Sequence, residues 1–183
     1  MTATPLVIGI DPSLTATGIA SEAGWTHCAG MPGHRGDTYR QRLGRINAIA
    51  SEAVNCVHHS VTGLVVMEGP AYSRGADPSA FDRAALWWLI YRGCHMRDIP
   101  VAVVTPAQVK VYATGKGNIR GKGPVVDAVA RRFPQYDTEG NDNICDAIVL
   151  LAMGLDHLGR PLADLPATHR RALERVDWPE GDS

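Results

Sequence analysis

The sequence predicts an α/β fold in which helices flank a mixed five-stranded sheet. Short apolar runs alternate with helical patterns, in the order three strands, helix, strand, helix, strand and helices. The connections between the first three strands are too short to hold a crossover helix, so these strands pair antiparallel. Each later strand is followed by a helix, which favours a mixed sheet with helices on both faces.

The chain begins with an antiparallel meander. Its first strand is the apolar run at residues 6–10, which ends at Asp11 because Pro12 then forces a turn. Two further strands, joined by a short glycine-containing turn, are predicted at residues 17–21 and 25–29.

The middle of the chain alternates helices with apolar strands. An amphipathic helix is predicted over residues 38–59, because apolar side chains recur there at steps of three and four. The strand at residues 64–67 ends at Glu68, and the last strand lies at residues 101–104. Between them, residues 79–97 form a helix that is apolar on nearly all sides.

Helices complete the carboxyl-terminal half. They are predicted at residues 106–113, 124–133 and 141–158. Residues 1–158 are therefore predicted to form one α/β domain. Beyond it the composition turns to proline, arginine and acidic residues, so residues 159–183 are predicted to be a weakly packed tail.

Composition excludes several classes of protein. The 183 residues carry 18 basic and 19 acidic side chains, for a formal net charge of −1, so any nucleic-acid surface must come from uneven charge placement. No apolar run approaches the ~18 residues that cross a bilayer. The amino terminus lacks signal-peptide features and the four cysteines lack zinc spacing, so we expect a cytoplasmic protein with reduced thiols.

Acidic residues stand where buried side chains are expected. Asp11 and Glu68 each follow an apolar strand, and Asp142 and Asp146 share one face at the start of the last helix. Strand ends and adjacent helix starts form the functional crevice of an α/β sheet. Oxygen-only ligands select a hard cation such as Mg²⁺ or Mn²⁺. Taken singly, each acid could cap a turn or pair with an arginine; together they indicate a metal site.

A basic segment lies between the last strand and the last helix. Residues 110–132 hold six basic side chains against Asp127 alone, for a local charge of +5. Glycines make residues 114–123 a flexible loop, which favours contacts with phosphates over an ordinary solvated face. The basic residues are Lys110, Lys116, Arg120, Lys122, Arg131 and Arg132.

Four motifs resemble those of the RuvC-type Holliday-junction resolvases. They are VIGIDPSLTATGIA at 7–20, LVVMEGP at 64–70, TPAQVKVYATGKGN at 105–118 with a further lysine at 122, and NDNICDAIVLLAMG at 141–154. They occur in the family's order and close to its spacing. The resemblance implies a ribonuclease H-like fold, a homodimer and divalent-metal cleavage of four-way DNA junctions, in recombination and repair or in phage DNA processing.

Phosphodiester hydrolysis is served by two metal ions about 3.5–4 Å apart. On this pattern Asp11 bridges the ions and Glu68 completes one of them. Asp146 completes the other, together with Asp142 or Asn143. Here the sequence departs from the Asp-x-x-Asp that family members often carry, because Asn143 stands three residues before Asp146. Charge favours Asp142 as the ligand and Asn143 as its helper.

The resemblance also assigns contacts with DNA. It implies that Lys110 and Lys122 hold the scissile strand or stabilise the transition state, although matching Lys122 to the family requires a one-residue insertion. An aromatic residue after Glu68 would wedge into the junction centre. Tyr72, with Phe81 as the alternative, fits this role. The predicted DNA contacts are Tyr72, Arg74, Lys110, Lys116, Arg120 and Lys122.

The apolar helix at residues 79–97 is either deeply buried or faces a second subunit. A four-way junction has pseudo-two-fold symmetry and paired incisions require two centres. We therefore predict a homodimer formed around Leu86, Trp88 and Leu89.

Three other functions remain compatible with parts of the pattern. The scaffold could serve another ribonuclease H-like nuclease, acting on RNA/DNA hybrids or in rRNA processing. A strand ending in Gly-x-Asp also opens ATP-binding proteins of the actin and sugar-kinase class, but these need two such domains and 183 residues do not supply them. The departure at Asn143 keeps a non-catalytic branched-DNA binding module open.

Overall fold

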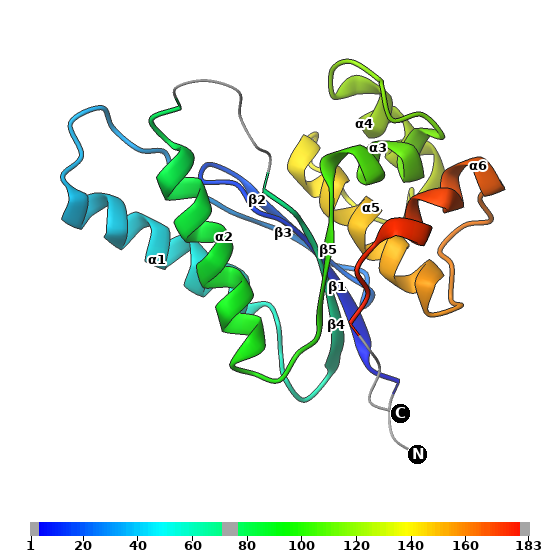
Figure 1. Cartoon of the computed structure of the whole chain (residues 1–183), viewed down its shortest axis with the longest axis horizontal. Helices are drawn as coiled ribbons and strands as arrows, with labels where there is room; N and C mark the ends of the chain where they lie inside the picture. Colours follow the sequence, from blue (N-terminus) through cyan, green and yellow to red (C-terminus); the bar gives the residue numbers. More distant parts are fainter. Residues whose placement is uncertain (1–3, 71–76, 180–183) are drawn as a thin grey trace.

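The computed structural model describes residues 4–70 and 77–179, and it contains the predicted mixed sheet (Figure 1). The five strands are β1 (Leu6–Asp11), β2 (Thr17–Ser21), β3 (Thr26–Ala29), β4 (Thr62–Glu68) and β5 (Val101–Val104). They lie in the order β3-β2-β1-β4-β5. β2 pairs antiparallel with β1 and β3, whereas β4 runs parallel to β1 and β5. The carboxyl ends of β1, β4 and β5 therefore share one edge.

Helices cover both faces of this sheet (Figure 1). One face carries α1 (Tyr39–Asn55) and α2 (Ala80–His95). The other carries α5 (Asp142–His157), against which α3 (Pro106–Thr114) and α4 (Gly123–Arg132) pack. These bounds lie close to the predicted ones. Within the part of the chain that the structure describes, no helix has both the length and the apolar character that a bilayer crossing requires.

Glycines let α5 lie directly on the sheet. A Cβ atom at Gly9 would lie 2.1 Å from the carbonyl oxygen of Ala147, and one at Gly18 would lie 2.1 Å from that of Asn143. Side chains at these two positions would collide with the backbone of the helix. Their absence brings the first turns of α5 next to the carboxyl end of β1.

The segment after residue 158 differs from the prediction. It forms α6 (Ala167–Arg170) and a 3₁₀ helix at Arg171–Arg175, both packed against α3. Leu165, Ala172 and Val176 are buried in the same core as α5. The expectation of a weakly packed tail at residues 159–183 is therefore wrong for residues 159–179. The segment is mostly polar, and its few apolar residues are too widely spaced to form a recognisable pattern, but they pack into a core formed by other elements.

The apolar residues of α2 lie on two sides of the helix, one buried in the core and the other exposed. Leu86 is 1% exposed and packs in the core beneath α1 and α2, so it cannot contact a second subunit. Trp88 is 62% exposed and Phe81 is 85% exposed. The predicted subunit contact at Leu86 is thus wrong, because the side chain faces the sheet.

Candidate metal centre

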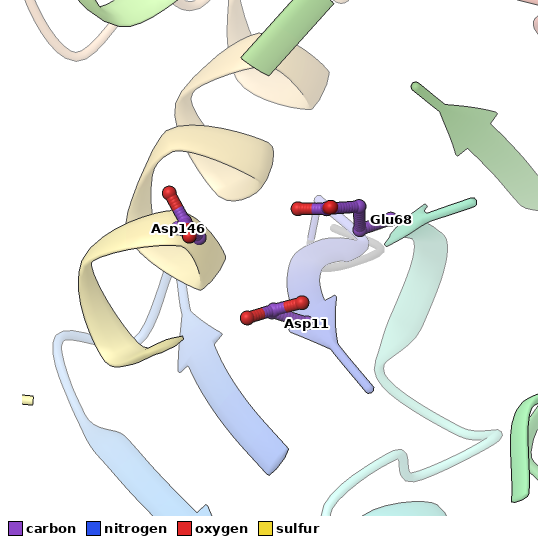
Figure 2. A group of neighbouring side chains, drawn as sticks. All are labelled: Asp11, Glu68 and Asp146. Carbon is purple, nitrogen blue, oxygen red and sulfur yellow. The ribbon is translucent and has the colours of Figure 1, made fainter. Parts of the chain in front are cut away.

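Three carboxylates converge at the carboxyl edge of the sheet (Figure 2). Asp11 ends β1, Glu68 ends the adjacent parallel strand β4, and Asp146 lies in the first turns of α5. One oxygen from each side chain lies within 4.8 Å of the other two. Parallel pairing of β1 with β4 brings the two strand ends together, and the close approach of α5 adds the third acid. The structure therefore brings together these three acids, which the sequence predicts to lie in one metal site.

Burial raises the pKa of all three acids, and repulsion from neighbouring acids adds to the shifts of Asp11 and Glu68. Burial, and then the charge of Asp146, raise the pKa of Asp11 to about 7, although Lys122 opposes this shift. Burial, and then the charges of Asp11 and Asp146, raise the pKa of Glu68 to about 9. Burial raises the pKa of Asp146 to about 6, against the opposing charges of Lys122 and Lys110. Gathering these carboxylates is unfavourable unless positive charge is placed among them.

The donor set fits a hard divalent cation. The group offers carboxylate oxygens, with no histidine or cysteine among its members. A divalent cation beside the three carboxylates would stabilise their ionised forms and so offset the effects that raise their pKa values. Asp11, Glu68 and Asp146 are the residues that would hold it.

Two lysines lie close enough to act on these acids. Lys110 belongs to α3, and Lys122 immediately precedes α4. The charges of both lower the pKa of Glu68 and of Asp146. Both lysines therefore lie within electrostatic reach of the carboxylates.

The two candidates for a fourth ligand are placed differently. The carboxylate of Asp142 forms an ion pair with Lys122 and does not belong to the group of three. Asn143 packs its backbone against Gly18 of β2, and its backbone N–H is bound by the side chain of Asn141, 2.9 Å away. The structure thus brings three of the predicted metal ligands together, and the carboxylate of Asp142 is not among them.

The other predicted DNA contacts and the rest of the basic segment are placed differently from Lys110. Lys116, Arg120 and Lys122 are exposed in the loop between α3 and α4. Tyr72 and Arg74 lie outside the described residues. Two other members of the basic segment are engaged within the fold, because Arg131 pairs with Asp127 and Arg132 donates to the carbonyl of Ala113. Of the loop residues, Lys122 pairs with Asp142, and Lys116 and Arg120 stand exposed.

A residue that sequence analysis did not single out supports Glu68. The indole Nε1–H of Trp87 donates a hydrogen bond to the carbonyl oxygen of Glu68 at 2.8 Å. Trp87 is only 8% exposed. This bond holds the backbone of β4 at the point from which the carboxylate projects. In the sequence Trp87 is one of several apolar residues in a helix, so no local signal distinguishes it.

Comparison with known proteins identifies the fold. No protein-family model and no curated protein matches the chain. A Thermus thermophilus RuvC structure matches with a TM-score of 0.60 at 18% identity, over 85% of this chain and 97% of that one. A structure of T. thermophilus RuvC in complex with Holliday junction substrate matches with a TM-score of 0.61 at 15% identity, over the same shares. The yeast mitochondrial Holliday junction resolvase Ydc2 gives 0.49 at 13%, over 95% of this chain and 82% of that one. The RuvC structures confirm the predicted ribonuclease H-like fold.

Proposed function

We propose that this protein is a structure-selective endonuclease that resolves four-way DNA junctions by divalent-metal-dependent hydrolysis. The observation that carries the proposal is the convergence of Asp11, Glu68 and Asp146 within 4.8 Å. The group stands at the carboxyl edge of a sheet whose fold is that of RuvC, a protein solved with Holliday junction substrate. Such a protein would act in recombination and repair, in the cytoplasm, where its four free cysteines stay reduced.

Asp11, Glu68 and Asp146 would hold Mg²⁺ or Mn²⁺, with two ions in each centre. Such ions supply, when bound, an activated water and neutralisation of charge on the attacking and leaving oxygens. Asp142, released from Lys122, or Asn143 would complete the set. Trp87 keeps Glu68 in place through its backbone carbonyl. Lys110 and Lys122 hold the scissile strand and stabilise the extra negative charge of the transition state.

DNA affinity would come from elements beside the metal centre. Lys116 and Arg120 stand exposed on a glycine-rich loop that leads from α3 to α4, where they can follow a phosphate backbone. Tyr72 and Arg74 would approach the junction from the segment after β4. Because these groups contact DNA without holding metal, binding and cleavage should be separable.

A homodimer would supply the two centres that paired incision needs. Large apolar side chains stand exposed on α1 and α2, with Tyr39 at 84%, Leu43 at 56% and Phe81 at 85%. A second copy would cover them. Sedimentation should show a dimer for the wild type and a folded monomer, unable to make paired cuts, for Leu43→Glu. A wild-type monomer that makes paired cuts would contradict this part of the proposal.

The deciding experiment compares substrates and metals. A labelled immobile four-way junction, a linear duplex and an RNA/DNA hybrid are incubated with Mg²⁺, Mn²⁺ or EDTA. We expect cleavage of the junction alone, and only with metal. Asp11→Asn should abolish cleavage while retaining junction binding. The matched control is Asp98→Asn, since Asp98 is exposed and precedes β5 at the opposite edge of the sheet.

Other outcomes point to the other functions. Preferred cleavage of the hybrid would identify another ribonuclease H-like nuclease. Junction binding with no cleavage under any metal would identify a non-catalytic binding module. Loss of folding in Asp11→Asn would make that residue structural. If Asp142→Asn cleaves like the wild type and Asn143→Ala is inactive, the last ligand position belongs to the side-chain amide of Asn143.

A further inference from the structure

A cavity of about 470 Å³ extends from the metal centre along α2. Its lining includes Asp11 and Glu68 of the metal centre and Trp87 and Trp88 of α2. It therefore combines carboxylates, beside which the centre would act on a phosphate, with an aromatic wall. The triad alone does not explain the aromatic wall.

Small residues on one side of α2 leave room for the cavity. Ala80 and Ala84 lie one helical turn apart in its lining, and Trp88 follows one turn later. Methyl groups leave space where longer side chains would fill it. The remaining lining residues are Pro12, Gly69, Pro70 and Arg83.

The two tryptophans have different roles in this wall. Trp87 is fixed by its hydrogen bond to Glu68 and by stacking on Tyr91, with ring centroids 5.3 Å apart. Trp88 packs edge-on against Trp87, with centroids 4.8 Å apart and an interplanar angle of 89°. Trp88 is nevertheless 62% exposed. A large aromatic face is thus held on a rigid support and left open at the cavity.

We infer that this cavity binds the base of a nucleotide next to the cleaved phosphate, unstacked from its neighbours, with Trp88 as its stacking platform. Bases stack on aromatic side chains regardless of their identity, because each base has a π face. The inference rests on the proposed nuclease function and adds a substrate subsite to it. Arg83, whose guanidinium pairs with Asp77, also lines the cavity.

The test uses the fluorescent base 2-aminopurine, substituted singly at positions around the cleavage site of the junction. Asp146→Asn serves as the background, so that bound DNA stays intact. Stacking on an indole quenches this base, so we expect quenching at one position next to the scissile phosphate. Trp88→Ala should remove it and weaken junction binding about ten-fold, since base–aromatic stacking is worth about 1–3 kcal/mol. Trp88→Phe should retain most of it.

Two further variants separate the cavity from a general loss of aromatic surface. Ala84→Leu fills the cavity from an exposed helical position and should also abolish the quenching. Trp25→Ala removes an exposed tryptophan at the β2–β3 turn, on the opposite edge of the sheet, and should change nothing. Cleavage and sedimentation are measured in parallel with each variant in the otherwise wild-type chain.

The readouts distinguish this inference from the proposed function. Junction cleavage by the wild type, with no quenching at any position, would overturn the nucleotide subsite and leave the nuclease intact. Conversion of Trp88→Ala to a monomer would also overturn it, because a second copy would then cover that ring. If both Trp88→Ala and Ala84→Leu lose the quenching while their oligomeric state stays unchanged, the nucleotide subsite is established.

Discussion

The two faces of the sheet share the same strands but are covered in different ways. On one face α5 lies between the sheet and the layer formed by α3 and α4, and twelve of its sixteen residues are buried. On the other face α1 and α2 form a single layer, and large apolar side chains remain exposed on them. The first face is completed by the chain itself. The second keeps apolar surface for a substrate or a partner, and the cavity beside the metal centre opens on it.

Each face also contains one buried aspartate held by arginine. Asp156 of α5 is 3% exposed and accepts hydrogen bonds from Tyr112 and from Arg170, which belongs to α6. Asp82 of α2 is 8% exposed and is bound by Arg42 and Arg45 of α1. On the α5 face the ion pair fastens the carboxyl-terminal segment. On the other face it joins the two helices to each other.

The largest effect should come from the contact between α5 and β1. Gly9→Ala would place a methyl group 2.1 Å from a backbone oxygen of α5, where no side chain can yield. We expect a loss of more than about 3 kcal/mol in the free energy of unfolding, or no folded protein at all. Urea denaturation followed by circular dichroism measures it. A Gly9→Ala protein as stable as the wild type would show that α5 does not lie so close to the sheet.

The second prediction tests the carboxyl-terminal segment. Arg170→Ala leaves the buried carboxylate of Asp156 without its cation, and we expect a loss of about 2 kcal/mol. Arg131→Ala is the matched control, because it breaks an Arg–Asp pair whose side chains are 71% and 59% exposed. Such exposed pairs are worth about 0–1 kcal/mol. Equal losses in the two variants would mean that the segment after α5 is only loosely attached.

The contrast between the two faces also explains what the sequence could predict. Asp11 and Glu68 could be predicted as site residues because each ends an apolar run, and this local pattern identified two members of the metal centre. Asp146 followed from its position at a helix start. The partners of the buried Asp156 could not be predicted, because Arg170 lies fourteen residues away in a polar segment and only the folded chain brings the two together. The same holds for Trp87, whose partner is a backbone carbonyl.

The metal centre lies at the carboxyl edge of the sheet. Three partly buried carboxylates stand close together there, which lowers the stability of the metal-free fold. In metal-free protein the pKa of Glu68 is raised to about 9 from an ordinary value of 4.5. The folded state then binds more protons than the unfolded state between these values, so stability falls as the pH rises through this window. At pH 8 the folded protein therefore keeps Glu68 largely protonated, although the unfolded chain would have it ionised. Glu68→Gln removes this cost, and we expect it to stabilise the protein at pH 8 in EDTA by about 1–2 kcal/mol.

Thermal melting in EDTA from pH 5 to pH 9 measures this effect, since each kcal/mol shifts the Tm by about 2–4 °C for a chain of this size. The wild type should lose stability with rising pH more steeply than Glu68→Gln. Added Mg²⁺ should raise the Tm of the wild type and raise that of the variant less. A lower Tm for Glu68→Gln in EDTA would show that the carboxylate stabilises the apo fold through a partner of its own.

The smallest effect concerns the counterpart of Gly9 on the opposite face. Gly44 lies inside α1, is exposed, and a Cβ atom there would meet nothing within 4 Å. Glycine in a helix interior is about 0.5–1 kcal/mol less favourable than alanine, because it loses more backbone entropy on folding. Gly44→Ala should therefore stabilise the protein by that amount, the reverse of Gly9→Ala. Denaturation at two protein concentrations measures it, and a loss of stability that grows with concentration would mean that a second copy packs on α1 at Gly44.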